Sequence, residues 1–112
     1  MTQPTTEEII RRQLADNPVI IYMKGSPDAP ECGFSAKAVA AIKTTGTDLA
    51  FVNVLQAPFI RERLPKISGW PTFPQLFVNG ELIGGCDITL DLYQKGELQK
   101  MVAAAAAQEQ ES

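Results

Sequence analysis

The sequence of 112 residues contains no histidine and only two cysteines. Without histidine the chain lacks the commonest general base and the commonest metal ligand, which excludes Ser-His-Asp and Cys-His hydrolases and His-containing zinc sites. A tetrahedral sulfur site needs four thiolates, and one chain supplies only Cys32 and Cys86. Any metal site must therefore take further sulfur from a second chain or from a small thiol.

The chain also lacks several features that would direct it elsewhere. No apolar run approaches the roughly 20 residues of a membrane span, and no basic segment followed by an apolar one marks a secretory signal. Glu7 and Glu8 are unusual in a mitochondrial presequence, and two cysteines are too few for a secreted disulfide scaffold. A net charge of -3 argues against nucleic-acid binding. We expect a cytoplasmic protein with neither nucleic acid nor membrane as partner.

The length and the ordinary content of apolar and charged residues predict one globular domain over residues 1–112. Periodicity, capping residues and turn residues predict its helices and strands. The expected elements are a helix opened by the Thr5–Glu8 capping box, strands at 19–23 and 49–54, a helix at about 34–45, a short helix from Pro58, a hairpin of 75–78 and 81–83 around Asn79-Gly80, a helix capped by Asp87, and a last helix at about 97–107.

Residues 25–31 are expected to form a loop and residues 108–112 a frayed tail. The first strand, helix and second strand should form a parallel unit with a right-handed crossover, and the hairpin adds an antiparallel pair. The order therefore predicts an α/β protein in which helices cover both faces of a four-stranded mixed sheet.

The segment Cys32-Gly33-Phe34-Ser35 resembles a two-cysteine redox motif whose second cysteine is replaced by serine. In a Cys-x-x-Cys pair the second thiol resolves the mixed disulfide that the first one forms, and a hydroxyl cannot do this. Cys32 is left with two options, a mixed disulfide that another thiol resolves or a role as thiolate ligand. It should lie at a helix N-terminus, which favours the thiolate, and Lys24 at the end of the preceding strand could point at the same place.

A second group of candidates follows Gly84-Gly85, where a glycine turn leads into a helix N-terminus that could bind an anion. Asp87 could cap this helix, bind an ammonium group, or do both, and Cys86 could be structural, a late resolving thiol or a ligand. Three cations could meet a second carboxylate: Lys24, Arg61 and Lys66. Together these groups describe a ligand with an amine, two carboxylates and a thiol.

Four motifs in this order resemble those of the monothiol glutaredoxins of the CGFS type, in their short single-domain form. The motifs are Met23-Lys24-Gly25, Cys32-Gly33-Phe34-Ser35, Trp70-Pro71-Thr72-Phe73-Pro74-Gln75 and Gly84-Gly85-Cys86-Asp87. The resemblance covers nearly the whole chain and implies a thioredoxin-like fold with Cys32 as the catalytic residue.

The resemblance also implies that the chain binds glutathione. It assigns the glycine carboxylate to Lys24 and Arg61, the peptide backbone to Phe73, and the γ-glutamyl end to Cys86 and Asp87. It further implies a cis peptide bond before Pro74, Thr72 beside the ligand and a partly exposed Phe34 near the thiol. Trp70 could support the same wall or pack in the core.

Two function classes remain open on this basis. In the first, Cys32 of two chains and two glutathione thiols supply the four thiolates of a [2Fe-2S] cluster. The resemblance then implies a homodimer, a heterodimer with a BolA-family protein, and delivery to apo iron–sulfur proteins in cluster assembly and iron homeostasis. In the second, the chain is a glutathione-dependent thiol–disulfide oxidoreductase that acts through Cys32. By resemblance, the long loop before Cys32 favours cluster binding and low turnover. A pure interaction module would need a dispensable Cys32.

Overall fold

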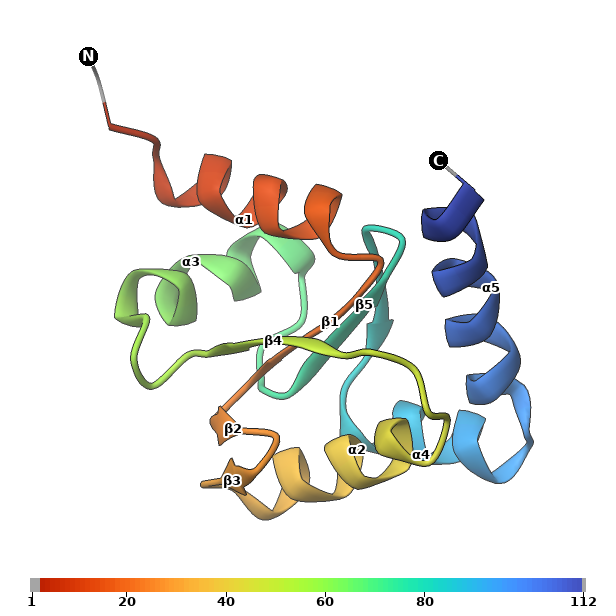
Figure 1. Cartoon of the computed structure of the whole chain (residues 1–112). Coiled ribbons are helices and arrows are strands. Elements are labelled where there is room, and N and C mark those ends of the chain that lie inside the picture. The colour runs from red at the N-terminus through yellow and green to blue at the C-terminus, as the bar shows by residue number, and fades with distance from the viewer. Residues whose placement is uncertain (1–2, 112) are drawn as a thin grey trace.

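The computed structural model describes residues 3–111, with side chains through residue 106, and its centre is a four-stranded mixed sheet (Figure 1). The strands lie in the order β4-β1-β5-β6; β1 pairs in parallel with β4 and antiparallel with β5, and β6 is antiparallel to β5. The bounds are Val19–Met23 for β1, Ala50–Asn53 for β4, Gln75–Val78 for β5 and Glu81–Gly84 for β6. The expected α/β architecture is confirmed.

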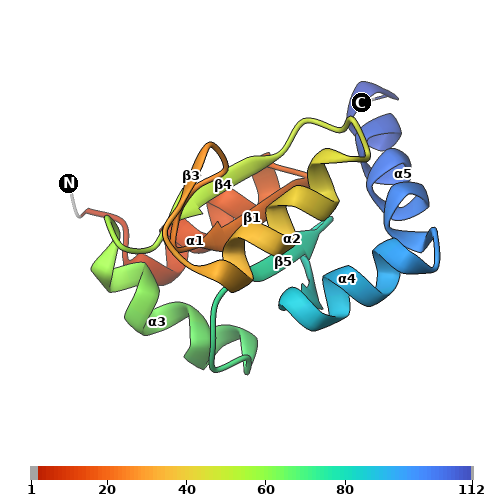
Figure 2. The same cartoon turned by 90° about the horizontal axis from the view of Figure 1, so that it is seen from below.

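Helices cover both faces of this sheet, α1 and α3 on one and α2, α4 and α5 on the other (Figures 1 and 2). Their bounds are Thr6–Asp16 for α1, Gly33–Lys43 for α2, Pro58–Ser68 for α3, Cys86–Gln94 for α4 and Glu97–Glu111 for α5. The last helix runs past its expected end near residue 107. The expected fraying concerns residues 108–112, whose side chains lie outside the described part of the structure, and it stays a prediction. None of the described helices is long and apolar enough to cross a membrane.

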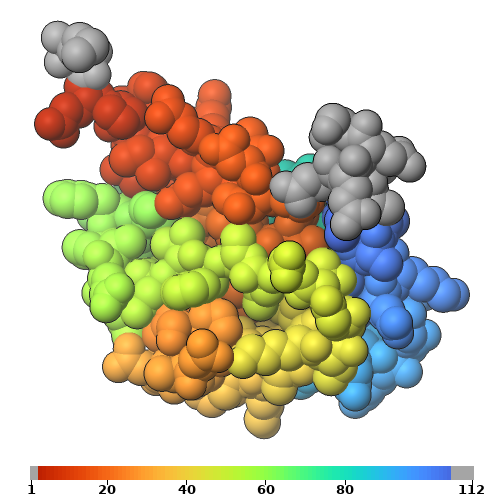
Figure 3. All heavy atoms as spheres, viewed as in Figure 1, coloured from red at the N-terminus to blue at the C-terminus, as the bar shows by residue number. Residues whose placement is uncertain are grey.

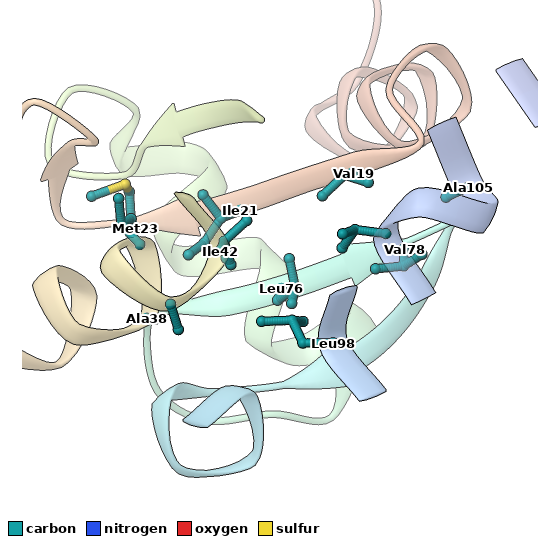
Figure 4. Close-up of a cluster of buried hydrophobic side chains, with 12 residues drawn as sticks. Val19, Ile21, Met23, Ala38, Ile42, Leu76, Val78, Leu98 and Ala105 are labelled. Atoms are coloured by element: carbon teal, nitrogen blue, oxygen red, sulfur yellow. The ribbon is translucent and has the colours of Figure 1, made fainter. Parts of the chain in front are cut away.

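Strand β1 is buried along its whole length, and its side chains alternate between two cores. Val19, Ile21 and Met23 face the helices α2 and α5, as Figure 4 shows for the larger core. Ile20 and Tyr22 face α1 and α3. Burial on both faces explains why this strand is a continuous apolar run. The strand ends at Met23, and the first functional candidate, Lys24, follows directly.

Local signals place the first and third helices. The Thr5 hydroxyl oxygen accepts a hydrogen bond from the Glu8 N–H at 3.1 Å, as an N-cap does. Pro58 stands in the first turn of α3, where its missing N–H costs nothing. Helix α3 ends at Gly69 with φ of 76°, a left-handed conformation that favours glycine. Both predicted helix starts are thus confirmed.

The expected loop at 25–31 is partly wrong, because it holds a short antiparallel hairpin of β2 (Gly25–Ser26) and β3 (Ala29–Pro30). A Cβ at Gly25 would lie 2.6 Å from both the Ala29 carbonyl oxygen and the Glu31 nitrogen, so only glycine fits. The hairpin packs against β4 and α2, in the orange and yellow region of Figure 3. Two-residue strands are too short to give an alternating pattern, and the sequence therefore indicated only a loop.

The start of α4 also differs from the expectation. Its N-cap is Gly85, not Asp87, and Asp87 lies inside the first turn. A carboxylate there still interacts favourably with the helix N-terminus. Helix α2 likewise begins one residue early, at Gly33, with Cys32 as its N-cap. The hairpin turn at Asn79-Gly80 is confirmed, with φ of 52° and 79°.

Candidate functional site

A groove of about 610 Å³ opens beyond the carboxyl end of β1. It gathers the start of α2, the first turns of α3, the segment before β5 and the start of α4. Its lining consists of Lys24, Cys32, Phe34, Arg61, Pro65, Trp70, Pro71, Thr72, Phe73, Pro74, Gly85, Cys86 and Asp87. Eight of the nine predicted site residues are among these, and the ninth, Lys66, is not.

Cys32 is the N-cap of α2, and its carbonyl oxygen accepts a hydrogen bond from the Ala36 N–H at 2.9 Å. Its thiol is free and partly exposed. The backbone N–H of Ser35 is the largest cause that lowers the pKa of Cys32 below its ordinary value. Partial burial opposes this shift, while the Phe34 N–H, the charge of Lys24 and the Ser35 hydroxyl add to it. The helix start therefore favours a nucleophilic thiolate, as predicted.

Ser35 also has a structural role. Its side chain is fully buried, and its Oγ accepts a hydrogen bond from the Lys24 N–H at 3.2 Å. The Lys24 carbonyl oxygen accepts from the Glu31 N–H at 2.9 Å, so both backbone groups of Lys24 are fixed. Asn53 Oδ1 accepts from the next N–H, that of Gly25, at 3.0 Å. Sequence reasoning missed these roles of Ser35 and Asn53, because the contacts join segments far apart in the chain.

Cys86, the first residue of α4, differs chemically from Cys32. Only 7% of its surface is exposed, and burial raises the pKa of its thiol, with the neighbouring Asp87 carboxylate adding to the effect. A raised pKa keeps this thiol protonated near neutral pH. The structure therefore favours a structural or ligand-contact role for Cys86 over that of a nucleophile.

The segment from Trp70 to Pro74 forms one wall of the groove. The cis peptide bond between Phe73 and Pro74 is confirmed. A Cβ at Gly85 would lie 3.0 Å from Trp70 Nε1, so the indole supports this wall from the side of α4. Behind the wall, the Gln75 amide donates to the Trp70 and Thr72 carbonyl oxygens at 2.9 and 3.1 Å. Sequence reasoning missed Gln75, although a glutamine opening an apolar strand was a visible signal.

The charged and aromatic candidates divide into those in the groove and one outside it. Lys24, Arg61 and Asp87 line the groove. Phe34 lies beside Cys32 with 60% of its surface exposed, as expected. Lys66 points elsewhere, with its Nζ 3.8 Å from a carboxylate oxygen of Glu62 on the same helix. Its predicted part in ligand binding has no support from this placement.

These groups suit a small anionic thiol or disulfide. The starts of two helices face the groove, and the first N–H groups of each have no partner within the helix. At α2 two of them already point to the Cys32 sulfur. Lys24 and Arg61 add positive charge beside the single reactive thiol. Among the described residues, no group of three or more Cys, Asp and Glu side chains could hold a metal ion. The site can thus form a mixed disulfide or provide one thiolate ligand.

Comparisons with known proteins agree with this reading. The glutaredoxin family profile matches residues 19–83. Glutaredoxin 4 of Escherichia coli strain K12 is 57% identical over 103 residues, which are 92% of this chain and 90% of the relative. Glutaredoxin 4 of Buchnera aphidicola subsp. Baizongia pistaciae is 63% identical over 94 residues, covering 84% and 87%.

Solved glutaredoxin structures have the same fold as this chain. The solution structure of reduced poplar apo GrxS14 superposes with a TM-score of 0.79 at 40% identity, covering 92% of this chain and 94% of the other. A crystal structure of a buckwheat glutaredoxin–glutathione complex has the same fold, with a TM-score of 0.79 at 22% identity and coverage of 91% and 96%. Fold, motif and relatives agree, and the chain belongs to the glutaredoxin family, in its monothiol CGFS branch.

Proposed function

We propose that this glutaredoxin binds glutathione in the groove and carries a [2Fe-2S] cluster shared between two copies of the chain. One observation carries the proposal. Cys32 presents a partly exposed, thiolate-favouring sulfur to the groove, while the position of a resolving thiol holds the buried Ser35. Such a thiol is a ready ligand and a poor partner for self-resolving disulfide exchange.

Glutathione matches the groups that line the groove. Lys24 and Arg61 would bind its glycine carboxylate, and the Phe73 backbone would pair with its extended peptide. Its γ-glutamyl carboxylate would meet the N-terminus of α4, and its ammonium group would meet Asp87. The buckwheat glutaredoxin crystallised with glutathione has the same fold, which supports the assignment.

The cluster is cargo, and the sulfur count decides how it is held. A [2Fe-2S] cluster takes four thiolates. Cys86 is buried and favours its protonated form, so each chain offers Cys32 alone. Two chains and two glutathione molecules supply the set. We further propose that the cluster passes to apo iron–sulfur proteins, and that a BolA-family protein can replace one copy in a heterodimer.

The test uses protein purified without oxygen and with glutathione. Its absorption and circular dichroism spectra are recorded, and a sizing column gives its oligomeric state. A visible [2Fe-2S] spectrum in a dimer fraction is expected. Cys32→Ala should abolish it, whereas Cys86→Ala, the matched cysteine control, should retain it. A colourless monomer that cannot be reconstituted would overturn the carrier proposal.

The lowered pKa of Cys32 supports a second candidate, glutathione-dependent removal of glutathione from protein thiols. The Cys32 thiolate attacks the glutathione sulfur of a protein–glutathione disulfide, so that a Cys32–glutathione disulfide forms and the protein thiolate leaves. A free glutathione thiolate then attacks that disulfide, which releases oxidised glutathione and regenerates the Cys32 thiolate. A fast deglutathionylation rate in protein without a cluster would make this the main activity.

A further inference from the structure

Gln75 is a fully buried polar residue at the start of β5, directly behind the wall of the groove. Its Nε2 donates to two main-chain oxygens of that wall, those of Trp70 at 2.9 Å and Thr72 at 3.1 Å. Both partners are acceptors, so only the amide nitrogen, and not the amide oxygen, can face them. The glutamine therefore fixes the direction in which these two carbonyl groups point.

The direction of the Thr72 carbonyl also sets the direction of the next N–H. Among the described residues, the one cis peptide bond joins Phe73 and Pro74, so the Thr72–Phe73 bond is trans. In a planar trans peptide the C=O and the N–H point in opposite directions. Because the Thr72 oxygen points inward to Gln75, the Phe73 N–H points away from it, on the side of the groove that Phe73 lines.

Two further observations single out this N–H. The Trp70 carbonyl is followed by Pro71, which has no N–H, so the Phe73 N–H is the one donor that Gln75 orients. Within the described part of the chain, this N–H has no hydrogen-bond partner of its own. A donor that is held in place and left free is suited to a ligand carbonyl.

We propose that Gln75 is a positioning residue that aims the Phe73 N–H at the peptide backbone of the ligand. The inference rests on the proposed binding of glutathione and names a residue that adds to the preference of the groove for a peptide thiol. Gln75 touches no ligand itself. Its effect passes through the Thr72 carbonyl to the amide of Phe73.

The test compares Gln75→Met with Gln13→Met in the full chain. The methionine side chain has a similar length to that of glutamine and carries no N–H donor. Gln13 is a matched control, because its Oε1 accepts from the Tyr22 hydroxyl at 2.9 Å and it lies outside the groove. The measured quantity is the equilibrium constant of the Cys32–glutathione disulfide relative to the Cys32 disulfide of 2-mercaptoethanol, which has no peptide.

Gln75→Met should lower this preference about tenfold, the equivalent of about 1.4 kcal/mol for one misdirected hydrogen bond, and Gln13→Met should leave it unchanged. The pH profile of Cys32 alkylation should not move in either variant, because its hydrogen-bond donors belong to α2. An unchanged preference in Gln75→Met overturns the inference. A wild-type chain without any preference overturns the glutathione site itself, which distinguishes the two failures.

Hydrogen exchange of the Phe73 amide in the wild-type chain tests the direction of this N–H, on which the inference depends, even if Gln75→Met does not fold. The amide should exchange fast in the reduced protein and become protected once Cys32 carries glutathione. Slow exchange in both forms, or fast exchange in both, would contradict the proposed direction of this N–H.

Discussion

Two glycines at helix starts, Gly33 at the start of α2 and Gly85 before α4, should respond in opposite ways to the same added methyl group. A Cβ at Gly85 would lie 3.0 Å from Trp70 Nε1 and 3.2 Å from the Pro74 carbonyl oxygen, tighter than ordinary contact. A Cβ at Gly33 would meet no atom within 4 Å. Gly85 has φ of -95°, which alanine can adopt, so its substitution tests packing rather than backbone conformation.

Gly85→Ala should lower the free energy of unfolding by about 1–3 kcal/mol, the usual cost of overpacking. Gly33→Ala should raise it by about 0.4–1 kcal/mol, because alanine restricts the unfolded chain. At about 2.1 cal/mol/K of unfolding entropy per residue, the 112 residues make 1 kcal/mol worth about 4 °C in Tm. We therefore expect a fall of about 4–12 °C for Gly85→Ala and a rise of about 2–4 °C for Gly33→Ala.

Calorimetry of the reduced proteins, which avoids mixed disulfides, measures both shifts. A Tm for Gly85→Ala at or above that of the wild type would show that the wall yields freely to the methyl group, and the packing argument would then be refuted. An equal fall for Gly33→Ala would mean that its neighbourhood is not open as described.

Three further measurements follow from the site and the core. Alkylation at a series of pH values, followed by mass spectrometry, should give Cys32 a pH midpoint below that of a free thiol and Cys86 a pH midpoint above it. The stabilisation of the Cys32 thiolate is lost as pH falls through its lowered pKa. The reverse order of the two midpoints would contradict the site. Lys24→Ala should weaken the glutathione disulfide of Cys32 while Lys66→Ala leaves it intact, and equal losses in a competition assay would argue against the groove. Tyr22→Phe removes a hydrogen bond to α1 and should cost about 0.5–1.5 kcal/mol in urea unfolding, whereas a neutral result would mean that this bond contributes nothing.

The elements that the sequence predicts well are those whose cause is local. Thr5 and Glu8 cap α1 through contacts three residues apart, and Asn79-Gly80 makes a turn whose positive φ angles these two residue types tolerate. The apolar run Val19–Met23 needs only burial on both faces. The hairpin at 25–31 was not predicted because its two-residue strands are too short to show an alternating pattern.

The sequence predicts most of the residues that line the site, but not the residues that hold them in place. The resemblance to a family identified the thiol and most of the groove, including the cis peptide bond before Pro74. The supports of these residues, Ser35 and Gln75 among them, act through main-chain groups that no side-chain motif reveals. Asp87 was wrong as a cap because the glycine before Cys86 already serves as the N-cap.

The difference between the two thiols has a consequence in mass action. With Cys32 accessible and Cys86 buried, the proposed carrier assembles its cargo site from two chains and two small molecules. At low loading, the amount of loaded carrier then rises with the square of the protein concentration and the square of the free glutathione concentration. Dilution or oxidation of the glutathione pool would release the cluster steeply, so a carrier of this design would respond to the redox state of its surroundings without a separate sensor.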